Sequence, residues 1–556
     1  MKDKQTTQKN PVTYERILTG LDTLKDYKRA KLSLEERIIE DELWWRLRHW
    51  EVLRRKKSTL STMPEPSSAW LFNSLINKHA DIMDSFPEPV CLPRSADDKD
   101  TARIISSVLP VIIEQNDFEK TYSDNNWYKL KHGVCAYGVF WNSSKENGIG
   151  DVDIKRIDVL NIFWQPGISD IQDSSNLFIV NLIDKDKIFS AYPSLKKQLL
   201  RTNDKVIELG SYAYDDSINT DDKFLVIDWY YKKSINGVTR LHYCKLIGDI
   251  LLYASENDPL YADRGWYDHG TYPVIFDVLY PEEATPFGFG IIAITKNPQT
   301  YIDKMDSNLL ENMDWATRIR YFGKKSMGIN ENDFLDLDRR IVEVEGDISE
   351  ERLRQITVAP FSDVYLALKK QKIDELKETS CNRDFSQGSV TGGVTAASAI
   401  AALQEAGNKN SRDMIASSNR AFVKIVTLII ELLRQFYTES RTFRIIGDGG
   451  DGYDFISFDN SLLNIYSESE GDNLSTSAPS LYRRPIFDVD IKARKRNPYS
   501  RLSQNELAKE LYSLGVFDQG NEEKALALLD IMDFDGIEKT REQIRSKLEK
   551  NRGAFI

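Results

Sequence analysis

The chain has 556 residues, 41% of them hydrophobic and 11% aromatic, and its formal net charge is −12. The length exceeds what a single hydrophobic core usually serves and the composition excludes general disorder, so we expect a globular protein of several domains. The negative charge argues against a protein that coats nucleic acid through bulk attraction to phosphates, but not against one that DNA slides past.

Cysteines and apolar stretches indicate the compartment. The four cysteines, Cys91, Cys135, Cys244 and Cys381, lie far apart and show neither disulfide-framework nor zinc-site spacing, which fits a reducing compartment. The polar N-terminus is unlike a secretory signal, and the longest apolar stretch, residues 425–433, is too short to span a membrane. We expect a soluble protein made inside the cell, with no membrane partner.

The N-terminal segment is predicted to be helical. Ser33 and Glu36 have the spacing of a capping box, and apolar residues at helical intervals continue beyond them. The four cations that end this helix, residues 54–57, are better explained as a solvated helix end than as phosphate contacts. Further helices are expected at 68–85 and 99–116, separated by a proline-rich stretch that stops the first one.

The next part of the chain is rich in β-branched and aromatic residues. Short runs of this kind, broken by Gly, Asn and Asp, occupy residues 133–141, 152–164, 177–183, 223–234, 238–246 and 249–255. They predict a mostly antiparallel sheet. Residues 1–285 are therefore interpreted as one α+β domain.

Three long helices are predicted in the middle of the chain. The Asn-Pro pair at 297–298 is expected to start a helix that reaches about Arg320. A compact segment with strand-like sequence spans 321–360, and a second helix begins near Ser362. The third helix, 395–438, would be about 65 Å long at 1.5 Å per residue. The first helix carries one apolar stripe, formed by Ile302, Met305, Leu309, Met313, Ala316 and Ile319.

The C-terminal part returns to strands and then ends in short helices. Strand-like sequence occupies residues 442–458 and 486–496, and Ser503 and Glu506 have capping-box spacing before an apolar helical pattern. The fold class expected for the chain is therefore α+β.

The stretch GSVTGGVT, residues 388–395, spaces its glycines like a phosphate-binding loop, G-x-x-x-x-G-K-[ST], but Val394 stands in the place of the lysine. The element before it has the pattern of a helix, whereas such a loop needs a strand to aim it. We therefore expect no nucleotide site here and interpret the stretch as a flexible loop.

No catalytic, cofactor or metal site is predicted. The five histidines show no metal-ligand spacing, and none adjoins a candidate nucleophile. The acids of GDGGDGYD, residues 447–454, are candidates for calcium but lack the spacing of an EF-hand, so a glycine-rich hairpin turn is favoured. We expect a protein that is not an enzyme.

Several stretches, in their order along the chain, resemble the portal proteins of tailed bacteriophages. They are SSAWLFNSLINKHADIMDSFPEP, HGVCAYGVFW, IDVLNIFWQPG, PFGFG before the first long helix, and TAASAIAALQEAGNKNSRD at the start of the last. The similarity covers most of the chain and is closest to portals of phages that infect Gram-positive bacteria. No single motif is as specific as a zinc signature. The order of helix, small β-containing insert, helix, loop and long helix carries the resemblance.

The resemblance implies the portal fold, an α+β architecture with named parts. These are an N-terminal wing (1–285), a hinge and first stem helix (286–320), a β-containing clip (321–360), a second stem helix (361–381), a tunnel loop (382–394), a long wing or spine helix (395–438), C-terminal wing strands (439–499) and a helical crown (500–556).

Two sets of residues are then expected to face DNA. The tunnel loop projects into the channel, where glycines and small polar groups suit contact with a duplex of any sequence. It consists of Asn382, Arg383, Asp384, Phe385, Ser386, Gln387, Gly388, Ser389, Val390, Thr391, Gly392, Gly393 and Val394. A basic cluster between stem and clip is expected to contact DNA or terminase, with a solvated helix end as an equal alternative; it consists of Arg318, Arg320, Lys324 and Lys325.

The resemblance also implies the assembly and its partners. Family members form a closed homo-oligomeric ring of about twelve subunits at one capsid vertex of the virion, assembled in the host cytoplasm. Double-stranded DNA passes through the channel, and the terminase, then head-completion or adaptor proteins, dock on it beside the major capsid and scaffold proteins. ATP hydrolysis belongs to the terminase, which agrees with the missing lysine.

Two other functions stay open on the sequence alone. A nucleic-acid-processing enzyme that uses carboxylates and magnesium would bring acids from separate strand ends to one metal. A virion scaffold protein without a channel is the other alternative, but it leaves the glycine-rich loop between two long helices unexplained.

Overall fold

The fold is taken from a computed structural model of the full chain. It describes residues 12–55, 64–202, 205–210, 212, 222–235, 237–317, 321–323, 353–355, 362–380, 409–446, 453–466, 482–483 and 485–495, together with isolated positions between 505 and 544. The chain divides into two compact units. Unit 2 comprises Leu43–Ser74 and Ile294–Ser380, and unit 1 comprises the rest.

Two helices open the described chain, α1 (Tyr14–Trp45) and α2 (His49–Arg55). Ser33 lies inside α1, so the predicted capping box is wrong; burial of the earlier residues against a sheet extends the helix toward its N-terminus. The predicted helix also does not continue to residue 57. It ends at Trp45, and Leu47 adopts a left-handed φ of 58° before α2 begins.

Three further helices follow, α3 (Trp70–Met83), α4 (Lys99–Gln115) and α5 (Phe118–His132). The first two confirm the helices predicted at 68–85 and 99–116. The third had no apolar stripe to predict it, because much of its buried side is polar and includes Asn125, Asn126 and Lys129.

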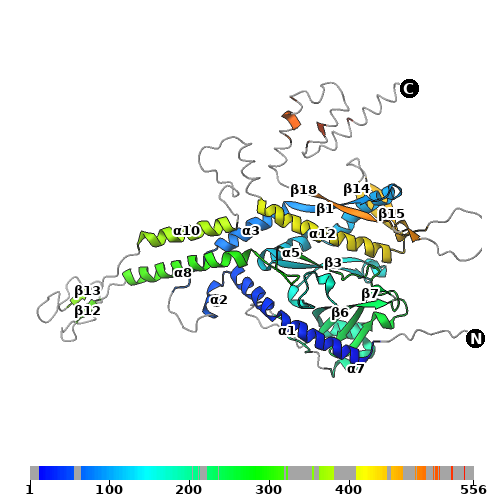
Figure 1. Ribbon diagram of the computed structural model, residues 1–556, viewed down its shortest axis with the longest axis horizontal. Helices are drawn as coiled ribbons and strands as arrows, with labels where there is room; N and C mark the ends of the chain where they lie inside the picture. The colour runs from blue at the N-terminus through cyan, green and yellow to red at the C-terminus, as the bar shows by residue number, and fades with distance from the viewer. Residues whose placement is uncertain are drawn as a thin grey trace, which may run out of the picture. The chain divides into compact units, whose positions relative to one another are not determined.

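The proline-rich stretch between α3 and α4 forms a strand, β1 (Ser85–Pro93). β1 pairs antiparallel with β18 (Phe487–Lys495) in a two-stranded sheet, and the two lie side by side in Figure 1. The prolines stop α3 as predicted, but they also fit an edge strand, because a proline is tolerated where the backbone N–H would point away from the ladder.

The strands predicted between residues 133 and 255 are confirmed, except that the run 152–164 forms two strands, β3 and β4, in different sheets. Together with β9, which was not predicted, they pair antiparallel in a three-stranded sheet in the order β3-β2-β9 and a five-stranded sheet in the order β4-β5-β6-β7-β8. Their bounds are β2 (Val134–Asn142), β3 (Asp151–Ile157), β4 (Ile162–Trp164), β5 (Asn176–Asp184), β6 (Lys223–Ile235), β7 (Val238–Ile247), β8 (Ile250–Ala254) and β9 (Val274–Val278).

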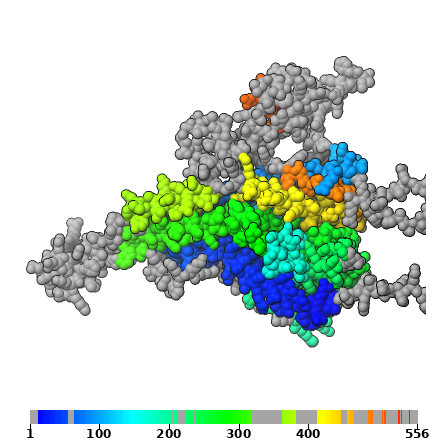
Figure 2. Space-filling model, in the orientation of Figure 1, coloured from blue at the N-terminus to red at the C-terminus, as the bar shows by residue number. Residues whose placement is uncertain are grey.

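Helices cover both faces of the five-stranded sheet. On one face, Ile17, Leu21 and Leu24 of α1 bury against Phe178 and Trp229 of the sheet, and Figure 2 shows α1 in blue along this part of the surface. On the other face, two short helices, α6 (Lys185–Ala191) and α7 (Lys196–Leu199), pack on β6 and β7. The sheet is therefore the middle layer of three in unit 1.

A long amphipathic helix, α12 (Lys409–Phe436), packs on the three-stranded sheet and on the β1–β18 pair. Its end agrees with the helix end predicted at about residue 438, and the predicted start at 395 lies outside the described residues. The strands β14 (Arg441–Ile446) and β15 (Tyr453–Phe458) follow and pair antiparallel; the glycine-rich turn predicted between them falls on residues 447–452, outside the described residues. A shorter pair, β16 (Ile465–Tyr466) with β17 (Tyr482–Arg483), precedes β18.

The middle of the chain holds two helices, α8 (Ile291–Thr317) and α10 (Asp363–Thr379). α8 begins six residues before the predicted Asn-Pro start, with Pro298 inside it, because the apolar Ile291 and Ile292 are buried and extend the first turns. α10 begins as predicted, with Ser362 as its N-cap. Two short strand pairs flank α8, β10 (Tyr280–Pro281) with β11 (Gly288–Phe289), and β12 (Tyr321–Gly323) with β13 (Leu353–Gln355).

The PFGFG stretch before α8 is a place of close backbone approach. A Cβ on Gly288 would lie 2.2 Å from the Tyr280 carbonyl oxygen, and one on Gly290 would lie 2.4 Å from that of Lys131. Both glycines are therefore required by packing rather than by a turn. The mixture of helices and antiparallel strands confirms the α+β fold class.

Candidate functional site

The two helices that the resemblance assigns to a stem, α8 and α10, run side by side in unit 2 (Figure 1). Lys369 of α10 forms an ion pair with Asp306 of α8. The ammonium groups of Lys304 and Lys372, one from each helix, lie 6.0 and 5.5 Å from the centre of the Tyr301 ring. Charge pairing and cation–π contacts thus connect the two helices near their middle.

A buried carboxylate, Asp303, anchors the middle of α8 to other segments of unit 2. Its Oδ2 lies 2.6 Å from Nδ1 of His49, and its Oδ1 accepts hydrogen bonds from the backbone N–H and the hydroxyl of Ser68 at 3.0 Å each. The Gln299 amide donates to the same Oδ1 at 2.9 Å. Asp303, His49 and Gln299 are fully buried, so one carboxylate joins three segments of unit 2.

The proton positions at His49 follow from its partners. Nε2 lies 3.2 Å from the carbonyl oxygen of Trp44, and because a carbonyl only accepts, Nε2 carries a hydrogen. At Nδ1, the 2.6 Å separation from the Asp303 carboxylate is that of a short hydrogen bond. The pair therefore joins α2 to α8 through a hydrogen bond between two fully buried side chains.

Outside this hub, α8 and α10 expose several large apolar side chains among charged ones. The exposed fractions are 52% for Tyr301, 54% for Met313, 45% for Trp315, 70% for Val364, 52% for Tyr365, 51% for Leu366 and 38% for Leu368. The stripe predicted on α8 is therefore not a continuous core face: Ile302 is buried, but Met313 is exposed. An apolar surface of this kind on a helical pair marks an interaction site.

Polar contacts also hold the first described turns of α12, in unit 1. Lys129 of α5 forms a buried ion pair with Asp277 of β9 at 2.7 Å, and it donates to the Ser418 hydroxyl at 2.9 Å. Ser417 donates to Asp277 at 3.0 Å. About two turns earlier, the Ser411 hydroxyl donates to Asp81 at 2.6 Å. The end of α12 nearest residues 382–394 is thus fixed by hydrogen bonds.

Both sets of residues predicted to face DNA lie outside the described residues. The tunnel-loop residues, 382–394, fall between Ser380, just after α10, and Lys409, where the described part of α12 begins. Arg318 and Arg320 follow α8, and Lys324 and Lys325 follow β12. The structure describes the elements that flank these residues, and their roles stay predictions.

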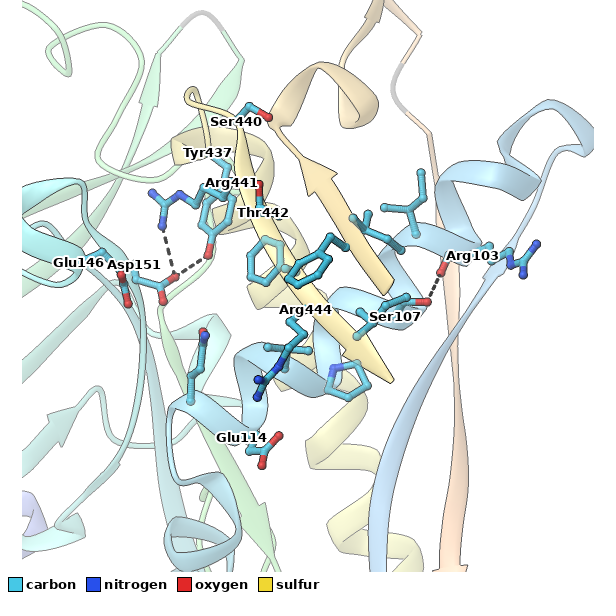
Figure 3. A pocket seen from close by; sticks show the side chains of 18 of the residues that line it. Arg103, Ser107, Glu114, Glu146, Asp151, Tyr437, Ser440, Arg441, Thr442 and Arg444 are labelled. Atoms are coloured by element: carbon cyan, nitrogen blue, oxygen red, sulfur yellow. Dashed lines mark hydrogen bonds and ion pairs between the residues drawn. The ribbon is translucent and has the colours of Figure 1, made fainter. Parts of the chain in front are cut away.

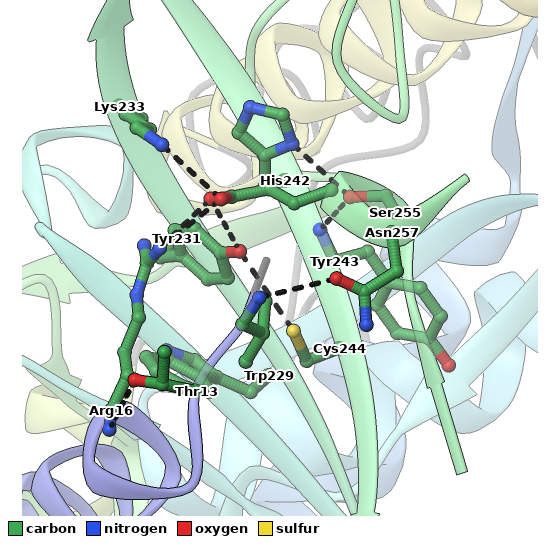
Figure 4. Close-up of polar contacts among 12 residues, drawn as sticks. Thr13, Arg16, Trp229, Tyr231, Lys233, His242, Tyr243, Cys244, Ser255 and Asn257 are labelled. Carbon is green, nitrogen blue, oxygen red and sulfur yellow. Dashed lines mark hydrogen bonds and ion pairs between the residues drawn. The ribbon is translucent and has the colours of Figure 1, made fainter. Parts of the chain in front are cut away.

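A second polar cluster attaches the start of α1 to the five-stranded sheet (Figure 4). Glu256 accepts hydrogen bonds from Arg16 at 3.0 and 3.2 Å, from the Tyr231 hydroxyl at 2.8 Å and from Lys233 at 3.2 Å. Burial alone would raise the pKa of Glu256, but the Tyr231 hydrogen bond and the Arg16 charge lower it below its usual value. The cluster is fully paired and serves to position α1.

The other end of α1 within unit 1 is held by Glu42. Its carboxylate forms a buried ion pair with Lys131 at 2.6 Å, and His132 lies 3.6 Å away. Burial alone would raise the pKa of Glu42, but the contacts with His132 and Lys131 lower it to about 2. In the middle of α1, burial lowers the pKa of Lys31 to about 7, although its ammonium donates to the Val159 and Ile162 carbonyl oxygens.

An open groove of about 1620 Å³ lies between α4 and the β14–β15 hairpin (Figure 3). The Arg441 guanidinium at its edge lies 3.9 Å from the Tyr437 ring centre and 3.9 Å from Asp151. The Tyr437 hydroxyl donates to the same Asp151 oxygen at 2.5 Å. Among the described residues, mixed apolar and charged side chains line the groove.

The described part of the chain holds neither a metal-binding cluster nor a membrane-spanning helix. No group of three or more His, Cys, Asp or Glu side chains there is placed to hold a metal ion. None of the described helices is both long and apolar enough to cross a membrane.

A comparison with protein families accounts for most of the chain. The phage P22-like portal protein family matches residues 81–553. The chain belongs to this family. No curated protein matches it. The matched part of this portal protein includes α8, α10 and α12, as well as the residues predicted to face DNA.

The residues that join these elements were not found from the sequence. His49 and Asp303 are 254 positions apart, and the partners Lys129 and Asp277 lie in a polar helix and a short strand. The only signal in the sequence is an acid, Asp303, beside the apolar Ile302 at the start of a predicted stripe. An acid in that place indicates a buried partner, but the sequence does not say which one.

Proposed function

We propose that this portal protein forms a ring-shaped channel at one capsid vertex of the virion, through which the terminase packages double-stranded DNA and through which the DNA later leaves. The family match over residues 81–553 carries this proposal. A closed ring needs a heterologous contact, in which each subunit offers two different surfaces to its two neighbours.

In this proposal α8 and α10 are the stem helices of the channel wall. The Asp303 hub already pairs the buried polar groups of α8. Apolar side chains such as Met313, Val364 and Leu366 remain exposed in the single chain. Packing these side chains against the same helices of a neighbour would remove them from water. About 25 cal/mol is gained per Å² of apolar surface buried in this way.

The DNA-facing roles are assigned to the segments next to these helices. Residues 382–394 would be the tunnel loop that contacts the moving duplex, and Arg318, Arg320, Lys324 and Lys325 would contact DNA or terminase between stem and clip. The support for the loop is its place between α10 and α12, whose near ends are fixed by the Ser380–Ser74 and Ser411–Asp81 hydrogen bonds. A flexible loop needs such fixed ends to stay in register around a channel.

The same proposal covers the other parts of the fold and the partners. The parts named wing, clip and crown keep the residue ranges given above, and the ring has about twelve subunits in the virion. Its partners are the terminase, the major capsid and scaffold proteins and the head-completion or adaptor proteins, and it has no enzymatic activity of its own. The closeness to portals of phages that infect Gram-positive bacteria stays a prediction.

Electron microscopy of the purified full-length protein tests the proposal. End-on class averages are expected to show rings of about twelve subunits around a pore that admits a duplex roughly 20 Å wide. A compact oligomer without a pore, or magnesium-dependent nuclease activity in the same sample, would contradict it. Density for residues 382–394 on the outside of the ring would overturn the tunnel-loop assignment alone.

A further inference from the structure

The two edges of the β1–β18 sheet differ. Pro87, Pro89 and Pro93 of β1 stand opposite Ala493, Ile491 and Phe487 of β18. A proline has no N–H to give to the ladder, so these are the pairs whose backbone groups point outward on both strands. The Cys91 N–H, on the same side of β1, is bound by the Ser106 hydroxyl at 2.9 Å. The outer edge of β1 is therefore closed.

The outer edge of β18 is open by the same register. Its outward positions are 487, 489, 491, 493 and 495, none of which is proline. Among the described residues, the one contact of these outward N–H groups is local: Ile491 donates to the Asp490 carboxylate at 2.9 Å. The sheet has only two strands in the described part of the chain. Soluble proteins rarely leave the backbone groups of a nine-residue edge strand unpaired.

The charges of β18 reverse about its centre. Asp488 and Asp490 precede Ile491, and Lys492 and Arg494 follow it. If a second β18 pairs antiparallel with Ile491 opposite Ile491, position 490 meets 492 and position 488 meets 494. Asp488, Asp490, Lys492 and Arg494 then each stand opposite a charge of the other sign, while Lys495 stands opposite Phe487, and this pairing favours the register over shifted ones. In the single chain, Asp488 is paired with Arg94. In this register, all five positions of one strand whose backbone groups point outward also stand opposite such positions of the other strand.

We propose that the outer edge of β18 binds the same edge of a second copy of this chain, antiparallel about Ile491, to form a four-stranded sheet in the order β1-β18-β18-β1. Both outer edges of that sheet are the proline-closed edges of β1, so the sheet ends at four strands. In the dimer, the Ile491 N–H donates to a backbone carbonyl of the second copy instead of to the Asp490 carboxylate. This contact is two-fold and isologous, so it is not the contact that closes a ring.

The place of this contact in assembly rests on the proposed ring function. A single closed ring has no two-fold partner for β18 within it, so the paired state belongs to chains outside the finished ring. The β18 contact would therefore hold free chains as dimers before they enter the ring, with the exposed edge covered.

One test removes the donor and keeps the strand. Ile491→Pro deletes an outward N–H opposite Pro89, a position that already carries proline on the other strand, while Ile491→Thr keeps both the N–H and a β-branched side chain. In sedimentation equilibrium of the full-length protein, the wild type and the Thr variant are expected to form reversible dimers. The Pro variant loses two symmetric hydrogen bonds per dimer, and its dimer association constant should fall by at least about tenfold. Equal dimerisation of all three proteins would overturn the proposal.

A second test determines the register of the two paired β18 strands. In a Cys91→Ala background, which is needed because Cys91 stands opposite Val489, mild oxidation is compared for Ile491→Cys and Val489→Cys. At position 491 the two Cα atoms would be about 5.5 Å apart across the two-fold axis, within disulfide range. At position 489 they would be offset by four residues, roughly 13 Å along the strands. A cross-linked dimer only at 491 is expected, and cross-linking at 489 to the same extent would overturn the register.

The outcomes separate this inference from the proposed function. Rings without any two-fold dimer at any protein concentration would overturn the β18 contact and leave the channel proposal standing. Dimers with the 491 cross-link but no rings in the presence of capsid and scaffold proteins would support the contact and contradict the channel proposal.

Discussion

The two compact units of the chain place their polar and apolar groups differently. The five-stranded sheet of unit 1 is lined on both faces by buried aromatic and aliphatic side chains, and buried polar groups elsewhere in the unit, such as Lys129 and Asp277, are paired with one another. In unit 2 the fully buried groups of α8 include Thr295, Gln299 and Asp303, while apolar side chains of α8 and α10 are exposed. The helix pair of unit 2 thus combines a buried polar cluster with exposed apolar side chains, whereas the sheet of unit 1 buries its apolar side chains on both faces.

The difference shows what buried polar groups do in each unit. In unit 1 the Lys129–Asp277 pair fixes the position of α12 on the three-stranded sheet. In unit 2 the Asp303 hub lies among buried apolar side chains such as Leu71 and Ile302, and its hydrogen bonds between buried groups specify how the segments are arranged. The predictions below test this contrast, from the largest change in the free energy of unfolding to the smallest.

The largest change is expected for Lys129→Met. The substitution leaves the buried Asp277 carboxylate without its cation and should lower the free energy of unfolding by about 3–5 kcal/mol. Urea unfolding followed by far-UV circular dichroism measures it. Lys25→Met, which breaks an exposed pair with Asp22 at 3.0 Å, is the matched control and should leave the midpoint unchanged. Equal midpoints for the two variants would show that the hub does not stabilise unit 1.

Glu42 should make the free energy of unfolding of unit 1 depend on pH, with an effect slightly smaller than that of Lys129→Met. Its pKa of about 2 in the folded protein lies below the ordinary value of 4.5, so its stabilisation is present above about pH 4.5 and is lost as the pH falls toward 2. The pKa difference corresponds to about 3 kcal/mol. Glu42→Gln should therefore be less stable than the wild type by about this amount at pH 7 and close to it at pH 2 to 3, in urea titrations at each pH. A stability gap that does not shrink at low pH would contradict the assignment.

A local change of about 2 kcal/mol is expected in unit 2 for Asp303→Asn. The amide keeps the shape of the carboxylate but loses its charge, and one of its acceptor positions becomes a donor that faces His49 or Ser68. Hydrogen exchange should become faster in α2 and α8 and stay unchanged in the five-stranded sheet of unit 1. Asp306→Asn, three positions along the same helix but at the surface pair with Lys369, is the control and should leave both regions unchanged.

Much of the fold was predictable, because local sequence determined it. The strands β2 to β8 carry β-branched and aromatic residues broken by turn residues, and Ser362 caps α10 in the place that its sequence indicates. Where burial outweighed a local signal, the prediction failed. Ile17 and Leu21 extend α1 past the capping pair at Ser33, and Ile291 and Ile292 start α8 before its Asn-Pro pair.

Features that depend on distant partners were not predictable. Lys129 gives α5 a polar sequence, and only the fold supplies the Asp277 that makes its burial favourable. The same holds for the prolines of β1, which break a helix locally but suit a strand edge once β18 lies beside it. For the candidate site, the sequence indicated the helices that flank residues 382–394, but not the hubs that fix them.

The smallest change in stability is expected where unit 2 exposes its apolar side chains. Val364 and Leu366 are 70% and 51% exposed in the single chain, so replacing both by serine should alter the free energy of unfolding by less than about 0.5 kcal/mol. If these side chains pack against a neighbouring subunit, the same variant should form far fewer rings in electron micrographs at equal protein concentration. Leu376→Ser, a change on the buried side of the same helix, should do the reverse and lower the stability of the chain itself. Normal ring formation by the Val364→Ser, Leu366→Ser variant would mean that the exposed face of α10 is not the packing surface, and the contrast between the two units would then rest on the Asp303 hub alone.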